Sequence, residues 1–318
     1  MDRIAHNIAL GEMTVNVSDN PTLRGYNRYE MDFATPLLEI RNKEKPRPPQ
    51  KSVGLALGGG VVRGLAHIGV ITVLEEAGIE VDYVAGTSAG SIIAVLYSAG
   101  INANELREFA LNFHWWQIAR PVWPRRGLVS FDRLAHFLRD RIGDIEFKDL
   151  KIPCSVVASD IETGERVTIR SGPVIPAIQA SCSVPGLVEP VELYGRRLCD
   201  GGVTDMLPVS ALREMGAGFT IGVDIFTFKL RRYLGPLGYL WAALEILLER
   251  AGGGLDYADC VIAPDLQGET YINFQKRNRL FELGRLATLQ KLECIRDEIG
   301  QEGVHQLTQP ADAVRIRG

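Results

Sequence analysis

The chain of 318 residues is 46% hydrophobic and 23% charged, and its formal net charge at pH 7 is -4. This composition is ordinary for a globular protein and allows one large core or two smaller ones. It provides no basic face for nucleic acid, so we expect neither DNA nor RNA as a partner.

Residues 1 to about 40 show little sustained periodicity and lead into a basic, proline-rich segment. Residues 41–51, RNKEKPRPPQK, contain three prolines and five basic residues. Each proline restricts its own backbone and that of the preceding residue, which predicts an extended linker. A basic linker could contact anionic lipid, although a solvated linker is the more ordinary interpretation. We predict an N-terminal extension and linker over residues 1–50, a main domain over residues 51–300 and a tail over residues 301–318.

From residue 52 onward, apolar runs of strand length alternate with segments of helical periodicity. They predict a buried strand at 52–59, a helix at 61–77, a strand at 81–86 and a helix at 88–100. This βαβα order is typical of a parallel sheet that is covered by helices. We therefore predict an α/β fold of three layers, α/β/α, around a central and mostly parallel sheet.

The pattern continues through the rest of the chain without an internal repeat. Asn102 and Glu105 have the spacing of a capping box at the start of a further helix. The remaining predicted elements are this helix at 102–113, a hairpin at 154–169 that turns at 162–165, a buried strand at 219–225 and a closing helix at 279–299.

Three features bear on the compartment of the protein. The sequence begins MDRIAHNIALGEM, which lacks the apolar stretch of a secretory signal. The most apolar later segment, residues 237–248, is too short to span a bilayer and contains Glu245. The five cysteines are scattered and form no C-x-x-C pair, which favours reduced core thiols over a disulfide framework or a metal site. We expect a cytoplasmic protein that could lie peripherally at the inner face of the membrane.

A glycine triplet follows the first predicted strand and precedes the first predicted helix, within GLALGGGVVRG at residues 54–64. Backbone amides and the helix dipole at such a junction can hold an anion. The glycines Gly58, Gly60 and Gly64 do not have dinucleotide-site spacing, because Arg63 stands where the third glycine should be. No Lys-Ser or Lys-Thr pair follows, which excludes a P-loop. A tight structural turn is the alternative to an anion site.

The segment AGTSAG places Ser88 between Gly86 and Gly90 in a G-x-S-x-G pattern. A strand before it and a helix after it predict a nucleophile elbow, in which the glycines relieve the crowding of a sharp turn. A serine nucleophile needs a base, and histidine is the commonest one. In the chain order Ser, Asp or Glu, His, only His305 fits. His67, on the helix after the glycine triplet, is expected to pack in the core.

Asp200, Gly201 and Gly202 follow an apolar approach that includes Leu198 and Cys199. The Asp-Gly pair is a strong hairpin signal, so a plain turn is one interpretation. An aspartate that leaves such a strand beside glycines could instead be partly desolvated. Desolvation favours the neutral carboxyl and makes its carboxylate a stronger base.

Taken together, GGGxxRG, GTSAG and DGG, with ASCSVPGLVEPVEL at 180–193 before the DGG, resemble the patatin-like phospholipase family in its bacterial branch. The resemblance covers residues 52–225 in detail and would make residues 51–300 a catalytic domain of patatin-like α/β/α fold. It implies a catalytic dyad of Ser88 and Asp200 without histidine. It also implies an oxyanion hole formed by the amides of Gly58, Gly59 and Gly60, with Arg63 closing the loop. Gly86, Gly90, Gly201 and Gly202 are the remaining motif glycines.

The function that this resemblance implies is a serine lipid acyl hydrolase of the phospholipase A, lysophospholipase or esterase type. Such an enzyme cleaves carboxylic esters through an acyl-enzyme and needs no metal or organic cofactor. Two alternatives remain open: a Ser-Asp-His esterase that uses His305, and a non-catalytic lipid-binding protein of the same fold.

The expected partner is a lipid or lysolipid substrate, and two apolar groups could serve it. Aromatic residues suited to a water–lipid boundary gather at Phe113, Trp115, Trp116 and Trp123, and apolar residues repeat at helical spacing at Leu237, Trp241, Leu244 and Leu248. For each group, packing on the core or on a second subunit is the ordinary alternative, and it leaves a homo-oligomer open.

Overall fold

The structure is a computed structural model that describes residues 51–112, 117–123, 125–226, 235–266 and 277–300. All of these belong to one compact unit, residues 48–318. The predicted linker, the aromatic residues Phe113, Trp115 and Trp116, and the tail with His305 lie outside the described residues. The predicted domain boundaries therefore stay predictions.

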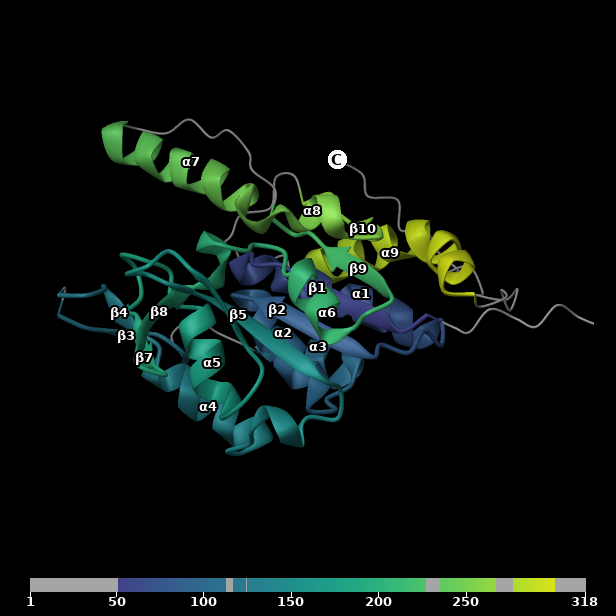
Figure 1. Cartoon of the computed structure of the whole chain (residues 1–318), viewed down its shortest axis with the longest axis horizontal. Helices are drawn as coiled ribbons and strands as arrows, with labels where there is room; N and C mark the ends of the chain where they lie inside the picture. Colours follow the sequence, from purple (N-terminus) through teal and green to yellow (C-terminus); the bar gives the residue numbers. More distant parts are fainter. Residues whose placement is uncertain (1–50, 113–116, 124, 227–234, 267–276, 301–318) are drawn as a thin grey trace, which may run out of the picture. The chain divides into compact units, whose positions relative to one another are not determined.

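The core of the fold is a mixed, mostly parallel sheet of eight strands (Figure 1). Its five parallel strands are, in spatial order, β10 (Cys260–Ile262), β9 (Phe219–Val223), β1 (Val53–Leu57), β2 (Tyr83–Thr87) and β5 (Cys154–Asp160). Its antiparallel strands are β6 (Arg166–Ile169), β7 (Val191–Leu193) and β8 (Arg196–Asp200). A separate small hairpin pairs β3 (Arg120–Pro121) with β4 (Val129–Ser130). The predicted sheet is confirmed.

Helices cover both faces of the sheet, which gives the predicted three layers. One face carries α1 (Leu65–Glu76), α2 (Ala89–Ser98), α3 (Ala103–Asn112), α5 (Val174–Ser181) and α9 (Arg277–Ile299). The other carries α6 (Val209–Met215) and α8 (Gly254–Tyr257). The further helices are α4 (Asp132–Ile142), which packs on α5, and α7 (Gly235–Glu249). Short 3-10 turns are η2 (Val61–Gly64), η4 (Phe147–Asp149), η5 (Gly201–Val203) and η6 (Ala251–Gly253).

The strand residues explain why the two helical layers differ in depth. Along β1, Leu55 and Leu57 belong to the large cluster under α1 and α2, whereas Ala56 belongs to the small cluster under α6. Ala85 on β2 also faces α6. Large side chains fill the deeper layer, while alanines let α6 lie close to the sheet.

Two sequence signals have the expected local structure, and one boundary differs. Asn102 and Glu105 each accept a hydrogen bond from the other's backbone N–H, which confirms the capping box. The 154–169 hairpin is confirmed as β5 and β6. The helix predicted at 61–77 begins as the 3-10 turn η2 and continues as α1 from Leu65; Val61, the first residue of η2, has a φ of 52°, outside the right-handed helical region.

Strands β2 and β8 lie end to end along the same edge of β5. β2 runs parallel to β5 and its last residue, Thr87, pairs with Val157. β8 runs antiparallel to β5 and its last residue, Asp200, pairs with Ala158. Strand β6 pairs with Val157 and Ala158 along the opposite edge of β5. Strand β8 must therefore pair with the same edge of β5 as β2, beyond the point where β2 ends. The two strands therefore run towards each other and stop at adjacent residues of β5.

Two structural observations concern the cysteines and the apolar segments considered in the sequence. Four cysteines are buried and free, and Cys294 is exposed and free. Within the described part of the chain, every helix is too short or too polar to cross a bilayer.

Candidate active site

Ser88 lies at the sharp turn between β2 and α2. Its backbone has φ 52° and ψ -124°, a conformation that a residue with a side chain rarely adopts. A Cβ at Gly86 would lie 2.6 Å from the Gly90 carbonyl oxygen, and one at Gly90 would collide with the Leu57 carbonyl oxygen. The turn therefore needs both glycines, as a nucleophile elbow does, and the predicted elbow geometry is present.

Asp200 lies where β8 meets the end of β2, and its carboxylate lies beside the Ser88 hydroxyl, close enough for this group to lower the carboxyl pKa. Its Oδ1 accepts the Gly202 N–H at 2.8 Å. Burial raises the pKa of Asp200 to about 6, although the nearby Ser88 hydroxyl and the hydrogen bond from Gly202 act in the opposite direction. The carboxyl is therefore a stronger base than a solvated aspartate and remains mostly ionised at pH 7.

The DGG segment is not the turn of a hairpin. Asp200 is the last residue of β8 and the N-cap of the 3-10 turn η5. The β7–β8 hairpin instead turns at Tyr194 and Gly195, which both have positive φ. A Cβ at Gly201 would collide with the Val157 carbonyl oxygen. The absence of a side chain at Gly201 lets this turn pack directly on β5, which places Asp200 beside the elbow.

Two of the three amides that the sequence predicts for the oxyanion hole make hydrogen bonds within the fold. The Gly58 N–H donates to the Val223 carbonyl and the Gly59 N–H to the Met206 carbonyl, both at 3.2 Å. These two amides therefore already have backbone acceptors within the fold. Among the described residues, the N–H groups of Gly60 and Val61 have no hydrogen-bond acceptor, and both residues line the cavity that contains Ser88.

Two buried side chains hold the glycine-rich loop. His67 Nε2 donates to the Gly58 carbonyl at 2.8 Å, and burial lowers the pKa of His67 to about 4, so the ring is neutral at pH 7. This confirms the predicted core position of His67 and adds a hydrogen bond to the loop. Arg63, also buried, donates to the Ile225 carbonyl at 3.4 Å, and its role in closing the loop stays a prediction.

Two serines of ASCSVPG support the dyad, and neither was predicted from the sequence to do so. Ser181 Oγ accepts the Ser88 N–H at 2.8 Å and donates to the Val157 carbonyl at 2.6 Å. The Ser183 carbonyl accepts the Asp200 N–H at 2.8 Å. One short segment thus holds the backbones of both dyad residues. Its place in the motif set was visible in the sequence, but nothing local indicated these two contacts.

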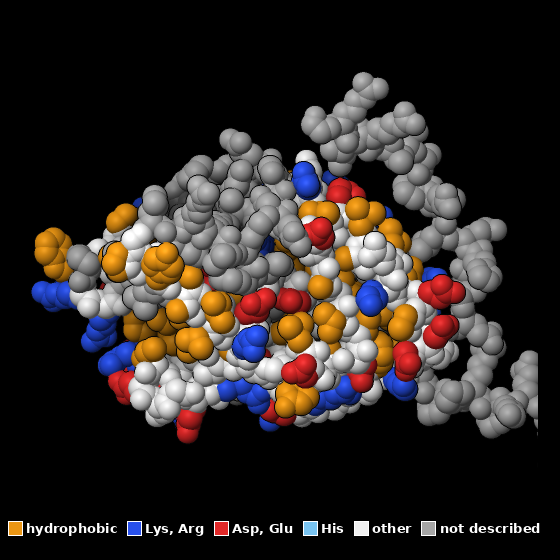
Figure 2. All heavy atoms as spheres, turned by 90° about the horizontal axis from the view of Figure 1, so that it is seen from above, with side chains coloured by type: hydrophobic (Ala, Val, Ile, Leu, Met, Phe, Trp, Pro, Cys, Tyr) orange, Lys and Arg blue, Asp and Glu red, His pale blue; other side chains and the backbone are white. Residues whose placement is uncertain are grey.

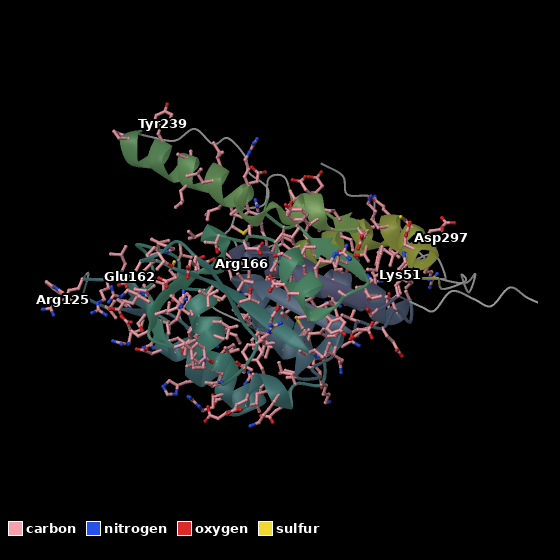
Figure 3. The ribbon with its side chains drawn as sticks, viewed as in Figure 1. Lys51, Arg125, Glu162, Arg166, Tyr239 and Asp297 are labelled. Atoms are coloured by element: carbon pink, nitrogen blue, oxygen red, sulfur yellow. The ribbon has the colours of Figure 1, made fainter. Side chains whose placement is uncertain are left out.

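A second aspartate supports the residue that precedes Ser88. The Thr87 hydroxyl donates to the Asp205 carbonyl at 2.9 Å. The Asp205 carboxylate accepts from Ser210 at 2.9 Å and from Arg166 at 3.0 Å. Burial raises the pKa of Asp205 to about 6 as well. Figure 3 labels Arg166, which contributes to this group from β6.

Ser88 and Asp200 open into an apolar cavity of about 500 Å³. Pockets of about 300–1,000 Å³ are typical of sites for small organic ligands. The wall includes Ile92 and Ile93 of α2, Phe109 of α3 and Phe131 before α4. Of the predicted apolar repeat, Leu244 and Leu248 also line the cavity, while the side chains of Leu237 and Trp241 lie outside the described residues. Within the described residues no three His, Cys, Asp or Glu side chains gather as a metal site.

The sequence of this chain is similar to a family model and to several known proteins. The family model described as patatin-like phospholipase matches residues 55–213. An NTE family protein of Mycobacterium tuberculosis is 35% identical over 197 residues, which are 59% of this chain and 51% of that protein. Lysophospholipase NTE1 of Scheffersomyces stipitis is 33% identical over 181 residues, 55% of this chain and 12% of that protein. The chain thus spans about half the length of the first relatives it matches and much less of the fungal one.

Solved structures give more distant matches. The crystal structure of VipD from Legionella pneumophila aligns with a TM-score of 0.48 at 14% identity, over 78% of this chain and 68% of that chain. The type III effector protein ExoU aligns with a TM-score of 0.44 at 13% identity, over 80% of this chain and 54% of that chain.

Proposed function

Because this chain belongs to the patatin-like phospholipase family, we propose that it is a serine hydrolase that cleaves carboxylic esters of lipids through a Ser88–Asp200 dyad. The observation that carries the proposal is the position of the Ser88 hydroxyl beside the buried Asp200 carboxylate, at the wall of an apolar cavity. Each part has a role in acyl transfer: a nucleophile, its base and a binding site for an acyl chain.

In the first half-reaction, Ser88 Oγ attacks the ester carbonyl carbon while Asp200 takes its proton. The tetrahedral intermediate then collapses, the carbon–oxygen bond to the alcohol breaks, and Asp200 returns the proton to the leaving oxygen. The pKa of about 6 suits both steps, because a base close to the working pH can accept and then release a proton.

We assign the oxyanion hole to the amides of Gly60 and Val61, in place of Gly58 and Gly59. The N–H groups of Gly60 and Val61 have no acceptor among the described residues. The amides of Gly58 and Gly59 already donate to backbone carbonyls. Donors that are fixed before the reaction stabilise the developing charge without reorganisation.

In the second half-reaction, water replaces the alcohol. Asp200 takes a proton from a water molecule, whose oxygen attacks the acyl carbon, and the bond to Ser88 Oγ breaks. The proton returns to Ser88 and the fatty acid leaves. The two half-reactions consume one ester and one water and release one alcohol and one acid.

The substrate class follows from the cavity wall. Apolar side chains such as Leu65, Ile68 and Phe109 line the space beside Ser88, so a long acyl chain gains from burial where a short soluble ester does not. The similarity to proteins named lysophospholipase supports an amphiphilic ester as substrate.

A fluorophosphonate probe tests the proposal directly. Wild-type protein should be labelled, with the adduct on Ser88 by peptide mass spectrometry, and Ser88→Ala should not be labelled. With lysophosphatidylcholine of a 16-carbon chain, kcat/KM should exceed that for p-nitrophenyl acetate. Folded wild-type protein that neither labels at Ser88 nor releases fatty acid from any lipid would instead identify a non-catalytic lipid-binding protein.

A further inference from the structure

Three apolar residues form the mouth of the cavity and remain exposed to solvent. Val61 begins η2, Val203 ends η5 and Leu187 follows α5, and all three also line the cavity. Val61 belongs to the glycine-rich loop and Val203 to the DGG turn, and Leu187 directly follows the ASCSVPG segment. The exposed apolar surface is therefore continuous with the site of the proposed chemistry.

The β3–β4 hairpin extends this mouth outward. The Leu128 and Val129 N–H groups both donate to the Leu187 carbonyl, at 2.9 and 3.0 Å. Leu128 is exposed, and Trp123 in the hairpin loop is 79% exposed. The large aromatic side chain of Trp123 is therefore mostly exposed within the described structure.

Helix α7 also lines the cavity and has apolar residues on two faces. Leu244 and Leu248 line the cavity, whereas Tyr239, Ile246 and Leu247 are exposed. Tyr239 and Leu247 are 70% and 69% exposed. Viewed from above, Figure 2 shows hydrophobic side chains over α7 and, at the left, hydrophobic and basic side chains together at the end of the hairpin.

Basic side chains accompany the outer apolar residues. Arg125 lies two residues from Trp123 and is exposed, with no ion pair to a described residue. Its neighbour Arg126 contacts Glu192 at 3.7 Å, with both side chains largely exposed. Figure 3 shows Arg125 and Tyr239 at the outer ends of the hairpin and of α7, both pointing away from the sheet.

We propose that this rim face, defined by Trp123, Arg125, Leu128, Tyr239, Ile246 and Leu247, docks on the surface of a bilayer that contains anionic phospholipid. Tryptophan and tyrosine prefer the level of the lipid headgroups, and exposed leucine and isoleucine gain by entering the acyl boundary. Arg125 and Arg126 complement lipid phosphates.

Docking on this face would present the cavity mouth to the membrane. A lipid could then reach Ser88 with its acyl chain passing from the bilayer to the apolar cavity without crossing water. This advantage rests on the proposed function, whereas the docking itself depends only on the rim residues.

Vesicle sedimentation with the full-length Ser88→Ala protein tests docking without turnover. Vesicles of phosphatidylcholine that contain about 30 mol% phosphatidylglycerol should bind the protein, and vesicles of phosphatidylcholine alone should bind it less. The double variant Trp123→Glu, Leu247→Glu should bind the anionic vesicles at least about tenfold more weakly. Arg125→Glu should weaken binding by about tenfold and reduce its dependence on phosphatidylglycerol.

Two matched controls carry the same changes elsewhere. Leu286→Glu alters an exposed leucine of α9. Lys51→Glu alters an exposed basic side chain, which Figure 3 shows at the other end of the described structure from Arg125. Both should bind like the Ser88→Ala parent. Bilayer binding that the rim variants leave unchanged would overturn the proposal and would place lipid binding elsewhere, for example on the basic segment at residues 41–51.

Two further measurements separate this proposal from others. Rim variants in the active protein should hydrolyse p-nitrophenyl butyrate at the wild-type rate, because the substituted side chains do not line the cavity. If no ester is hydrolysed but vesicles still bind through the rim, the catalytic proposal fails and docking stands. If the rim variants convert a dimer to a monomer in size-exclusion chromatography and leave vesicle binding intact, the face is a contact between two copies and docking is wrong.

Discussion

The backbone N–H of Ser88 donates to Ser181 Oγ at 2.8 Å, and this hydroxyl in turn donates to the Val157 carbonyl of β5 at 2.6 Å. The nucleophile elbow is thus fixed to the strand against which both β2 and β8 end. Ser181 touches no reacting atom of the proposed chemistry, so it is a positioning residue.

Ser181→Ala should lower kcat by roughly 10- to 100-fold with little change in KM, because small displacements of a nucleophile cost rate more than binding. The rate of fluorophosphonate labelling should fall in parallel. Ser183→Ala is the matched control, since Ser183 Oγ donates to the Gln179 carbonyl and its backbone carbonyl still holds Asp200. Equal kinetics for the two folded variants would show that Ser181 does not position the nucleophile.

Asp200→Asn should lower turnover by roughly 10²- to 10⁴-fold, as expected for loss of a general base. His305→Ala should stay within a few-fold of wild type, and Ser88→Ala should be inactive. Fatty-acid release from a lysophospholipid measures all three, after circular dichroism has shown that each is folded. An inactive but folded His305→Ala protein would restore the Ser-Asp-His alternative.

The same Asp200→Asn change should make the protein more stable above pH 6. Folding raises the pKa of Asp200 from 3.8 to about 6, so ionisation opposes folding as pH rises through this interval. Removing the ionisable group should raise the free energy of unfolding at pH 8 by on the order of 1–3 kcal/mol. The gain should shrink at pH 4, where the native carboxyl is protonated. Thermal melting at both pH values measures it, and an equal or lower stability at pH 8 would contradict the argument.

The activity should fall on the acid side with an apparent pKa near 6. Asp200 acts as a carboxylate, and below its pKa of about 6 the protonated form cannot accept the Ser88 proton. Asp205 has a similarly raised pKa, so Asp205→Asn is the informative control. A profile of kcat/KM from pH 4 to pH 8 should keep this limb in Asp205→Asn. Loss of the limb in that variant would assign it to Asp205.

Gly90→Ala should destabilise the fold by about 1–3 kcal/mol or more, because its Cβ would collide with the Leu57 carbonyl oxygen, where backbone must move. Gly64→Ala is the matched control from the same region. Its Cβ would lie 3.4 Å from the Ala89 Cβ and its φ is -50°, which alanine adopts without strain. Denaturant unfolding should separate the two variants. Similar stabilities would show that the elbow can relax around a side chain at residue 90.

The sequence by itself determined the local parts of this protein. The apolar runs, the Asn102–Glu105 cap and the β5–β6 hairpin have their predicted structure, since each depends on residues close together in the chain. The G-x-S-x-G pattern also implied a strained turn at Ser88, because the need for small flanking residues is local. His67 was correctly expected in the core.

Only the tertiary structure decided how these parts meet. No local signal indicates that β2 and β8 end at adjacent residues of β5, a pairing that brings Ser88 and Asp200 together across more than a hundred residues. The same holds for the amides of Gly58 and Gly59, whose acceptors lie on β9 and beside α6. Hydrogen bonds between distant strands depend on register, and register is set by the packing of the whole sheet rather than by neighbouring residues. The glycine-rich loop could therefore be found in the sequence, but which of its amides remain available could not.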